Sequence, residues 1–303
     1  MSTNPDHPPR TRPDRGQHPT SAAPGPLAGR GALVIGGGGG FGRAIAAALA
    51  ADGAAVTIMG RTGATLRAAA ATIAAAAPGA LPVRVSVGDS ALEQDVAAAV
   101  RVADETPLVA VVTTVGGGTF RPVLALDAET LEHDFRRNVT TALHAIRYGG
   151  QALAARGGGS IVCTSSSAGG HSFPFMPSYS VSKAALEALV RVAADELGHL
   201  AVRVNVVRPG IVATDGKNPG LLLADPELAA ATVAEKPLSR VGRAEDVAAA
   251  VRFLCGPESS WVTGACLPVE GGAHLRRAPR LEKLARIVSG DEVVDAALAG
   301  RIP

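Results

Sequence analysis

The sequence predicts an α/β protein built on a doubly wound parallel sheet in a single domain. Short apolar runs, each typical of a buried strand, alternate with longer segments whose apolar residues recur at helical spacing. The alternation continues from Gly31 to about Leu275, with no internal repeat and no second composition regime. Because strands joined in this way cross over with one hand, we expect helices on both faces of the sheet.

The first half of the chain supplies four strand–helix pairs. The first helix is ended by Asp52-Gly53 and the second by Pro78-Gly79, which are turn signals. The expected strands are 32–35, 55–59, 81–87 and 108–115. The helices that follow them are 43–51, 64–77, 92–102 and 127–156.

The second half continues the alternation and then changes character. The expected strands are 160–164, 202–207 and 267–269, with helices at 181–197 and 245–254. Between strand 202–207 and helix 245–254, the segment 215–237 reads as a mobile substrate lid with a short helix containing Leu228 to Val233.

Both ends of the chain differ from the central domain, which we place at 29–274. Residues 1–28 are rich in Pro, Arg, Asp and Ser without periodicity, so we expect a disordered tail, with an electrostatic docking arm as the alternative. The extension 275–303 has apolar residues at helical spacing, and Ser289 to Glu292 resembles a capping box for a second short helix. This extension is read as a peripheral packing arm or as a cover for a neighbouring subunit's site.

Composition excludes several classes of protein. The chain has 29 basic and 27 acidic residues, a formal charge of +2, so nothing points to a nucleic-acid partner. No apolar run has membrane-spanning length, and the N-terminus lacks a signal-peptide core. Three cysteines are scattered without metal-ligand spacing, which favours a reducing compartment and no metal site. We therefore expect a soluble cytoplasmic protein.

A glycine-rich turn between the first strand and the first helix predicts a phosphate cradle. Its key residues are Gly36, Gly40, Phe41 and Gly42. Backbone amides and the positive end of a helix bind a pyrophosphate there, and side chains would obstruct its approach. The spacing Gly-x-x-x-Gly-x-Gly differs from the Gly-x-Gly-x-x-Gly fingerprint, so a flexible glycine linker is the alternative interpretation.

Tyr179 and Lys183 predict acid–base chemistry. Positions four apart lie on one face of a helix, so a phenol and an ammonium are presented side by side. A nearby cation favours the phenolate, and we expect it to lower the phenol pKa towards working pH.

Taken in order, these motifs resemble the classical short-chain dehydrogenase/reductase family over about residues 31–272. Ser166 lies thirteen residues before Tyr179, as the family's catalytic serine does. The residues that carry the resemblance are the glycine turn 36–42, Asn138, Ser166, Tyr179-x-x-x-Lys183, Pro209-Gly210 and Val269-Glu270-Gly271-Gly272. The resemblance implies a Rossmann-type fold with a C-terminal helical extension, and a nicotinamide-dependent oxidoreductase acting on a ketone or secondary alcohol.

The resemblance also implies a role for each catalytic residue. Tyr179 is then the general acid for carbonyl reduction, and Lys183 lowers its pKa and holds the nicotinamide ribose. Ser166 donates a hydrogen bond to the substrate oxygen. Asn138 disturbs the long helix after the fourth strand and holds a proton-relay water.

Cofactor choice is indicated at the end of the second strand. Met59-Gly60-Arg61-Thr62 offers Arg61 where NAD-binding relatives usually have an Asp, and an Arg suits a 2′-phosphate. We therefore expect NADP. NAD is the alternative, in which case Arg61 is a solvated loop residue. The remaining cofactor residues implied are Gly36, Gly40, Phe41, Gly42, Gly116, Tyr179, Lys183, Pro209, Gly210, Ile211 and Thr214.

Three positions depart from the family pattern. Thr113-Thr114-Val115-Gly116 replaces Asn-Asn-Ala-Gly, Ser86 replaces an Asp that touches adenine (with Asp89 nearby), and Ile35 replaces a threonine. These departures keep open a catalytically silent module that senses NADP.

Substrate and assembly are indicated only broadly. Phe173, Phe175, Met176 and Leu221 to Leu223 line an apolar pocket or pack in the core, which leans towards a 3-oxoacyl thioester or a steroid, and His171 is expected at the surface. In relatives, the long helices and the C-terminal end of the domain build a homotetramer.

Overall fold

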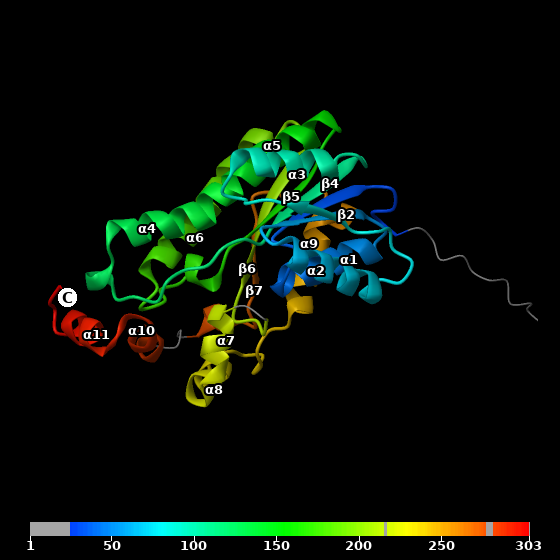
Figure 1. The fold of residues 1–303 in the computed structure, drawn as a ribbon. Coiled ribbons are helices and arrows are strands. Elements are labelled where there is room, and N and C mark those ends of the chain that lie inside the picture. Colours follow the sequence, from blue (N-terminus) through cyan, green and yellow to red (C-terminus); the bar gives the residue numbers. More distant parts are fainter. Residues whose placement is uncertain (1–24, 215–216, 277–280, 303) are drawn as a thin grey trace, which may run out of the picture.

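Seven parallel strands form one sheet in the order β3-β2-β1-β4-β5-β6-β7 (Figure 1). The computed structural model describes residues 25–214, 217–276 and 281–302. The strands are β1 (Gly31–Ile35), β2 (Ala55–Gly60), β3 (Arg84–Val87), β4 (Leu108–Thr113), β5 (Gly159–Thr164), β6 (Val202–Pro209) and β7 (Cys266–Val269). The predicted doubly wound α/β class is therefore confirmed.

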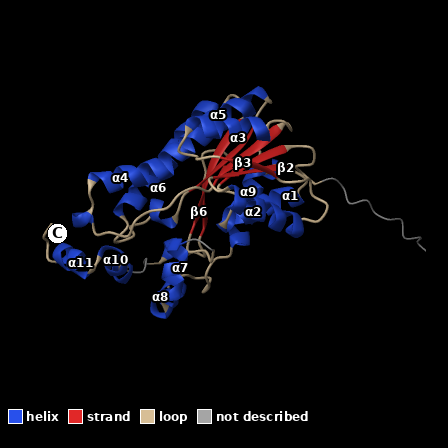
Figure 2. Ribbon diagram, in the orientation of Figure 1, coloured by secondary structure: helices blue, strands red, loops and turns tan. Residues whose placement is uncertain are grey.

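Helices cover the two faces of this sheet, as Figure 2 shows in blue. One apolar cluster packs α1 (Gly40–Ala51), α2 (Gly63–Ala76) and α9 (Ala244–Cys255) on one face. A second cluster packs α3 (Glu93–Ala103), α5 (Thr141–Ala155) and α6 (Pro177–Gly198) on the other. The strands between them are buried on both faces, which is why they read as continuous apolar runs in the sequence.

The direction of chain winding reverses between β1 and β4, which are neighbours in the sheet. In open parallel sheets, ligands bind at the carboxyl ends of the strands at such a switch point. The glycine turn follows β1 there, and Thr114 follows β4. The fold therefore brings the two segments together at the expected place for a cofactor.

The predicted helix 127–156 is interrupted. It consists of α4 (Ala128–Phe135), a π-helical turn (Arg136–Thr140) and α5. The side chain of Asp127 accepts a hydrogen bond from the Thr130 amide and so begins α4. The π-helical turn places Asn138 at its centre, a position that uninterrupted helical periodicity does not specify.

Two strand predictions were too long. The strand expected at 81–87 pairs with β2 only over Arg84–Val87, because Pro82 has no amide to donate and Leu81 is half exposed. The strand expected at 108–115 pairs with β5 only as far as Thr113. Beyond it, the Thr114 amide donates to Ile35 at 2.9 Å, so this stretch turns towards β1.

The predicted disordered tail 1–28 lies largely outside the described residues, and its last part is ordered. Leu27 is buried in the first apolar cluster, and its amide donates to the carbonyl of Asp52 at 3.0 Å. An isolated leucine among Pro and Gly carries no periodic signal, which is why the boundary was misplaced.

The lid and the C-terminal extension pack against each other. The lid contains two helices, α7 (Lys217–Ala224) and α8 (Pro226–Ala234), where we expected one. The extension forms α10 (Glu282–Ser289) and α11 (Asp291–Leu298), beside the lid in Figure 1. The predicted capping box is wrong, since Gly290 caps α11 without a side chain and the Ser289 hydroxyl instead donates to the Phe120 carbonyl at 2.9 Å.

Across the described ranges, none of the helices is both long and apolar enough to cross a membrane. The same ranges contain no group of three His, Cys, Asp or Glu side chains placed to hold a metal ion.

Candidate active site

A cavity of about 760 Å³ opens at the carboxyl ends of the strands. The glycine turn, the loop after β4, the segment from Thr164 to Tyr179 and the lid all contribute to its walls. Ser166, Tyr179 and Lys183 line it, as do all the predicted cofactor residues except Arg61. The cavity therefore brings together the sequence-predicted residues other than Arg61 and Asn138.

The glycine turn has the geometry of a phosphate cradle. Gly36 (φ 88°) and Gly40 (φ 51°) have left-handed backbones that favour glycine. A Cβ at Gly42 would overlap the Gly36 carbonyl oxygen, so the turn closes tightly onto α1. No side chain caps the N-terminus of α1, and its first amides have no intrahelical acceptor. This arrangement fits the diphosphate of a dinucleotide.

Thr114 fixes the turn to β4. Its hydroxyl lies 3.2 Å from the carbonyl oxygens of both Ile35 and Gly36. The hydroxyl that replaces the family's amide therefore still links the two strand ends at the switch point. Thr113, by contrast, is buried with its hydroxyl unpartnered among the described residues.

Tyr179 and Lys183 lie in the first turns of α6, which begins at Pro177. The Lys183 Nζ is 5.6 Å from the centre of the Tyr179 ring and donates to the Thr164 carbonyl at 2.8 Å. Gly118 packs directly on the Tyr179 ring, because a Cβ there would lie 2.7 Å from its Cγ. Gly116 is equally constrained, since a Cβ would lie 2.6 Å from Asn138 Oδ1 and 2.7 Å from Lys183 Nζ.

The pKa directions differ from the sequence prediction. Burial raises the pKa of Tyr179, and this outweighs the hydrogen bond with Ser166 and the charge of Arg137, which lower it. Burial also lowers the pKa of Lys183 to about 8. The expectation that Lys183 lowers the phenol pKa is therefore wrong for this arrangement, because desolvation acts on both groups at once.

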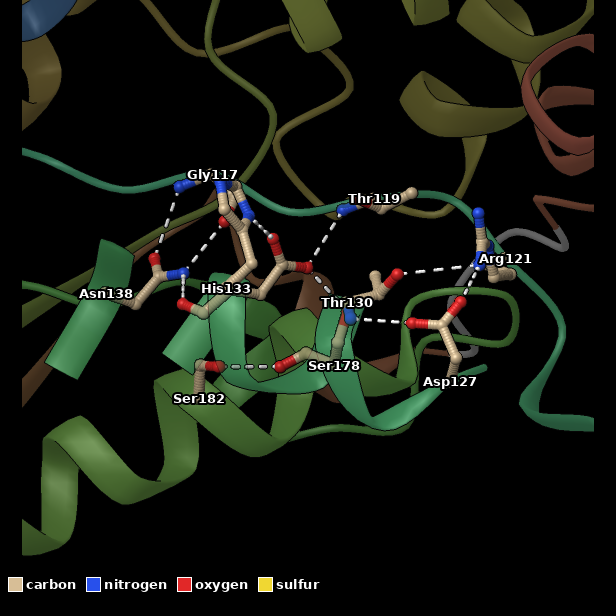
Figure 3. Close-up of polar contacts among 10 residues, drawn as sticks. Gly117, Thr119, Arg121, Asp127, Thr130, His133, Asn138, Ser178 and Ser182 are labelled. Carbon is tan, nitrogen blue, oxygen red and sulfur yellow. Dashed lines mark hydrogen bonds and ion pairs between the residues drawn. The ribbon is translucent and has the colours of Figure 1, made fainter. Parts of the chain in front are cut away.

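Asn138 is fully buried and acts on the loop after β4 (Figure 3). Its Nδ2 donates to the carbonyls of Gly117 (2.8 Å) and Asp134 (2.7 Å), and its Oδ1 accepts from the Gly117 amide at 3.2 Å. Asn138 lies behind the cavity wall rather than in it. It fixes the peptide that borders both Lys183 and Tyr179.

Asp134 was missed by sequence reasoning, and it joins the same loop to α6. Its carboxylate is buried and accepts from the Thr119 amide (3.2 Å) and from the Ser178 hydroxyl (2.6 Å). Ser178 immediately precedes Tyr179 in the first turn of α6. Figure 3 shows Ser178 on α6 and Thr119 on the loop after β4. Asp134 lies near the end of α4, and no motif or spacing in the sequence marked it.

A second missed group lies beneath Lys183. The buried Glu187 carboxylate accepts from the Ser165 hydroxyl at 2.6 Å and from Arg208 Nη2 at 2.6 Å. Hydrogen bonding to Glu187 raises the pKa of Arg208. The group ties α6 to the ends of β5 and β6. Glu187 lies one helical turn after Lys183, which is the signal that points to it.

The positions expected to contact the adenine and its ribose do not line the cavity. Arg61 is exposed at the end of β2, next to Gly60. The Leu66 side chain lies 3.3 Å from a Cβ built on Gly60 or on Gly38, so the end of β2 adjoins the glycine turn. Asp89 accepts from the Ala91 amide at 2.9 Å within its own turn and does not line the cavity, and neither does Ser86.

The substrate side of the cavity has an apolar wall. Phe120, Phe173, Met176, Leu222 and Leu281 line it and belong to a third apolar cluster that joins the lid to α10. The extension thus contributes to the cavity, which the sequence did not specify.

His171 corrects another expectation, because it is a cavity residue rather than a surface one. Its Nδ1 is buried without a hydrogen-bond partner in the described parts of the chain. Its ring meets that of His274 edge-on, with centroids 6.1 Å apart.

Known proteins resemble the chain in both sequence and fold. A family profile described as enoyl-(acyl carrier protein) reductase matches residues 36–274. An Arabidopsis thaliana protein named NADPH-dependent aldehyde reductase-like protein, chloroplastic, is 33% identical over 268 residues, which is 83% of this chain and 97% of that protein.

Solved structures give the same answer. A short-chain type dehydrogenase/reductase from Mycobacterium ulcerans has a TM-score of 0.83 and 33% identity, covering 89% of this chain and 98% of that one. A 7α-hydroxysteroid dehydrogenase complexed with NADH and 7-oxoglycochenodeoxycholic acid has a TM-score of 0.76 and 30% identity, covering 81% and 94%. With the parallel sheet and the glycine turn, these matches show that the chain belongs to the short-chain dehydrogenase/reductase family of nicotinamide-dependent oxidoreductases.

Proposed function

We propose that the protein is an NADP-dependent reductase of a ketone, or dehydrogenase of the matching secondary alcohol. The observation that carries the proposal is the convergence of Ser166, Tyr179 and Lys183 on the cavity that begins at the glycine turn. Asn138 supports this group from behind through the Gly117 peptide.

Each residue has a role in the proposed reaction. The bound nicotinamide cofactor supplies or accepts the hydride. Ser166 donates a hydrogen bond to the substrate oxygen, and Tyr179 gives that oxygen a proton in the reductive direction. The raised pKa of Tyr179 keeps its phenol protonated, which is the form that reduction needs. Lys183 binds the ribose hydroxyls, and the amides of the glycine turn hold the diphosphate.

Arg61 supports the choice of NADP. It follows β2 beside the glycine turn, with no carboxylate at 59–62 to bind the ribose hydroxyls of NAD. Fluorescence titration should show NADPH binding more tightly than NADH, and Arg61→Ala should weaken NADPH alone, by roughly tenfold or more. Arg101→Ala, an exposed α3 residue away from the cavity, is the matched control. Equal affinities for the two cofactors would contradict the choice.

Turnover separates an enzyme from a silent sensor. We expect NADPH oxidation with a panel of ketones, and Tyr179→Phe should lower kcat by roughly 10²- to 10⁴-fold while changing the Kd of NADPH far less. A wild-type protein that binds NADPH and turns over no carbonyl compound would support the sensor instead. The apolar wall favours ketones with an apolar segment, such as a 3-oxoacyl thioester or a steroid.

We also propose that the protein is a homo-oligomer, by analogy with its family. Val181 and Val192 of α6 and Leu143 of α5 are apolar side chains with 37% to 55% of their surface exposed. Light scattering should give a dimer or tetramer, and Val192→Glu should shift it towards the monomer. A monomeric wild type would refute this proposal.

A further inference from the structure

The lid end of the cavity contains polar groups that the proposed reaction does not use. Thr232 Oγ1, Lys236 Nζ and His171 Nδ1 are buried, and none has a hydrogen-bond partner within the described parts of the chain. All three residues line the cavity. An unpaired buried polar group costs stability, and a charged one costs more. Three such groups at one end of a binding cavity point to a ligand that pairs with them.

Thr232 and Lys236 come from one segment of the chain. Thr232 lies in the last turn of α8 and Lys236 two residues beyond its end at Ala234, and only 3% and 4% of their surfaces are exposed. The Lys236 amide donates to the Val233 carbonyl at 3.1 Å, so the backbone is still turning where the side chain leaves it. The hydroxyl and the ammonium are therefore presented from adjacent turns of one segment.

The nearest carboxylate does not neutralise Lys236. Glu270, at the end of β7, accepts from the His274 amide (2.8 Å) and pairs with His274 Nδ1 (2.6 Å). Lys236 has no ion pair within 4.0 Å among the described residues, and burial lowers its pKa although Glu270 acts to raise it. A buried ammonium without a counterion is the least satisfied group of this cavity.

Other charges at this end also bear on the ligand. The guanidinium of Arg276 lines the cavity and donates to the Ala234 carbonyl at 2.8 Å, at the end of α8. Glu235 also lines the cavity but is partly exposed, so solvent screens it. The buried charged group that lacks both a hydrogen bond and an ion pair among the described residues is thus a cation, and its complement is an anion.

The cofactor's phosphates bind elsewhere in the proposed complex. The glycine turn follows β1, whereas Lys236 lies beside Glu270 and Gly271 after β7, with β4, β5 and β6 between them. The strands that precede the two sites, β1 and β7, are four strand spacings apart, roughly 19 Å along the sheet. An anion at Lys236 therefore belongs to the substrate.

We propose that Lys236 and Thr232 bind a carboxylate of the substrate at the end remote from the reacting carbon. The substrate class is a carbonyl or hydroxy acid whose apolar segment lies against Phe173 and Leu222. The class of reaction rests on the proposed function, whereas the binding of a carboxylate does not.

The first experiment measures binding without turnover. Calorimetry compares hexanoate with hexanamide, which share an apolar chain and lack a reacting carbonyl, with and without NADP⁺. The wild type should bind hexanoate at least roughly tenfold more tightly, and Lys236→Met should reduce this preference to less than about twofold. Equal binding of acid and amide by the wild type, or an unchanged preference in Lys236→Met, would overturn the proposal.

Two further variants give a second test of the subsite and a control. Thr232→Val has the same shape without the hydroxyl and should reduce the acid preference by roughly threefold to tenfold. If Lys236→Met fails to fold, Thr232→Val tests the subsite instead. An unchanged acid preference in Thr232→Val then counts against the proposal. Arg101→Met removes a cation outside the cavity and should leave the preference intact.

Two outcomes distinguish this proposal from a cofactor-phosphate site and from the proposed function. If Lys236→Met weakens NADPH binding instead, the anion is a cofactor phosphate and the substrate assignment is wrong. If neither the oxo acids and their methyl esters nor any other ketone of the panel is turned over, the proposed function fails, while an acid preference in calorimetry still supports the subsite. If the enzyme turns over both compounds, 5-oxohexanoate should have a larger kcat/KM than its methyl ester. Lys236→Met should remove this difference.

Discussion

Lys183 has two neighbours in the structure that the motif Tyr179-x-x-x-Lys183 does not reveal. It is 2% exposed, donates to the Thr164 carbonyl and lies against Gly116. The motif specifies which face of the helix Lys183 occupies, but burial lowers the pKa of its amine. Sequence spacing therefore predicted the pairing with Tyr179 correctly and the direction of the Tyr179 pKa shift incorrectly.

The lowered pKa of Lys183 has a measurable effect on stability. Its ordinary pKa is 10.5 and burial lowers it to about 8. Below pH 8 the amine is protonated in both the folded and the unfolded chain, so the desolvation penalty is constant. Between pH 8 and 10.5 only the unfolded chain holds the proton, and stability rises with pH. The free energy of unfolding of the wild type, relative to Lys183→Met, should therefore increase by up to roughly 3 kcal/mol across this interval.

Urea denaturation of both proteins across the interval checks this prediction. Subtracting the variant removes the contribution of other groups that titrate at high pH. A difference that stays level or falls between these pH values would show that Lys183 is not desolvated as described.

At the scale of elements, the connection between α4 and α6 is the feature that sequence analysis did not anticipate. Asp134 is 1% exposed and accepts from the Thr119 amide and the Ser178 hydroxyl. Its charge also acts to raise the pKa of Tyr179. The carboxylate thus fixes the loop after β4 and influences the proposed acid without touching it.

Replacing Asp134 separates its two effects. Asp134→Ala leaves two buried donors unpaired and should cost roughly 2–5 kcal/mol of stability. Asp134→Asn keeps an acceptor for both donors but removes the charge, so stability should largely return. The alkaline limb of the kcat profile should nevertheless move to lower pH, because the charge that raises the Tyr179 pKa is gone.

The pH profile of kcat and the free energy of unfolding are measured on the wild type, Asp134→Ala and Asp134→Asn. Recovery of stability in Asp134→Asn with an unmoved pH profile would limit Asp134 to a structural role. Failure of Asp134→Asn to recover stability would show that the negative charge itself is required by the donors.

At the scale of the whole molecule, the C-terminal extension is part of the substrate side. Leu284 of α10 is fully buried in the cluster that contains Phe120, Met176 and Leu222. Lys283 also pairs with Asp225 at 2.5 Å, and Asp225 caps the start of α8. The extension therefore packs on the lid as well as on the loop after β4.

Leu284→Ala should loosen the lid. Large-to-small substitution at a fully buried leucine costs roughly 2–5 kcal/mol. Because the lost contacts join α10 to the lid, amide hydrogen exchange should accelerate in α8 and α10 more than in the sheet, and substrate KM should rise while the Kd of NADPH stays constant. Val288→Ala, in the same helix but 44% exposed, should change neither quantity. Uniform acceleration over the whole chain would contradict a local role.

Most of the fold followed from apolar patterning, since the parallel sheet and its two covered faces follow from the alternation of strands and helices in the sequence. The residues missed are polar groups buried by tertiary packing, such as Asp134, Glu187 and Lys236. Each belongs to a helix or to the turn that ends one, and each meets its neighbours only when distant segments meet. Local spacing cannot distinguish such residues from solvent-facing ones, because the same residue types occupy both places.

The π-helical turn at Arg136–Thr140 makes chain length at this point a determinant of activity. Such a turn holds one residue more than the α-helical turn it replaces. Removing one residue there would let α4 and α5 join as one continuous helix, which costs the core little. Each residue of an α-helix advances by about 100°, so the amide of Asn138 would no longer be directed at Gly117. We expect such a deletion to leave a folded protein with little turnover. In this helix, the additional residue of the π-helical turn is what directs the Asn138 side-chain amide at the loop after β4.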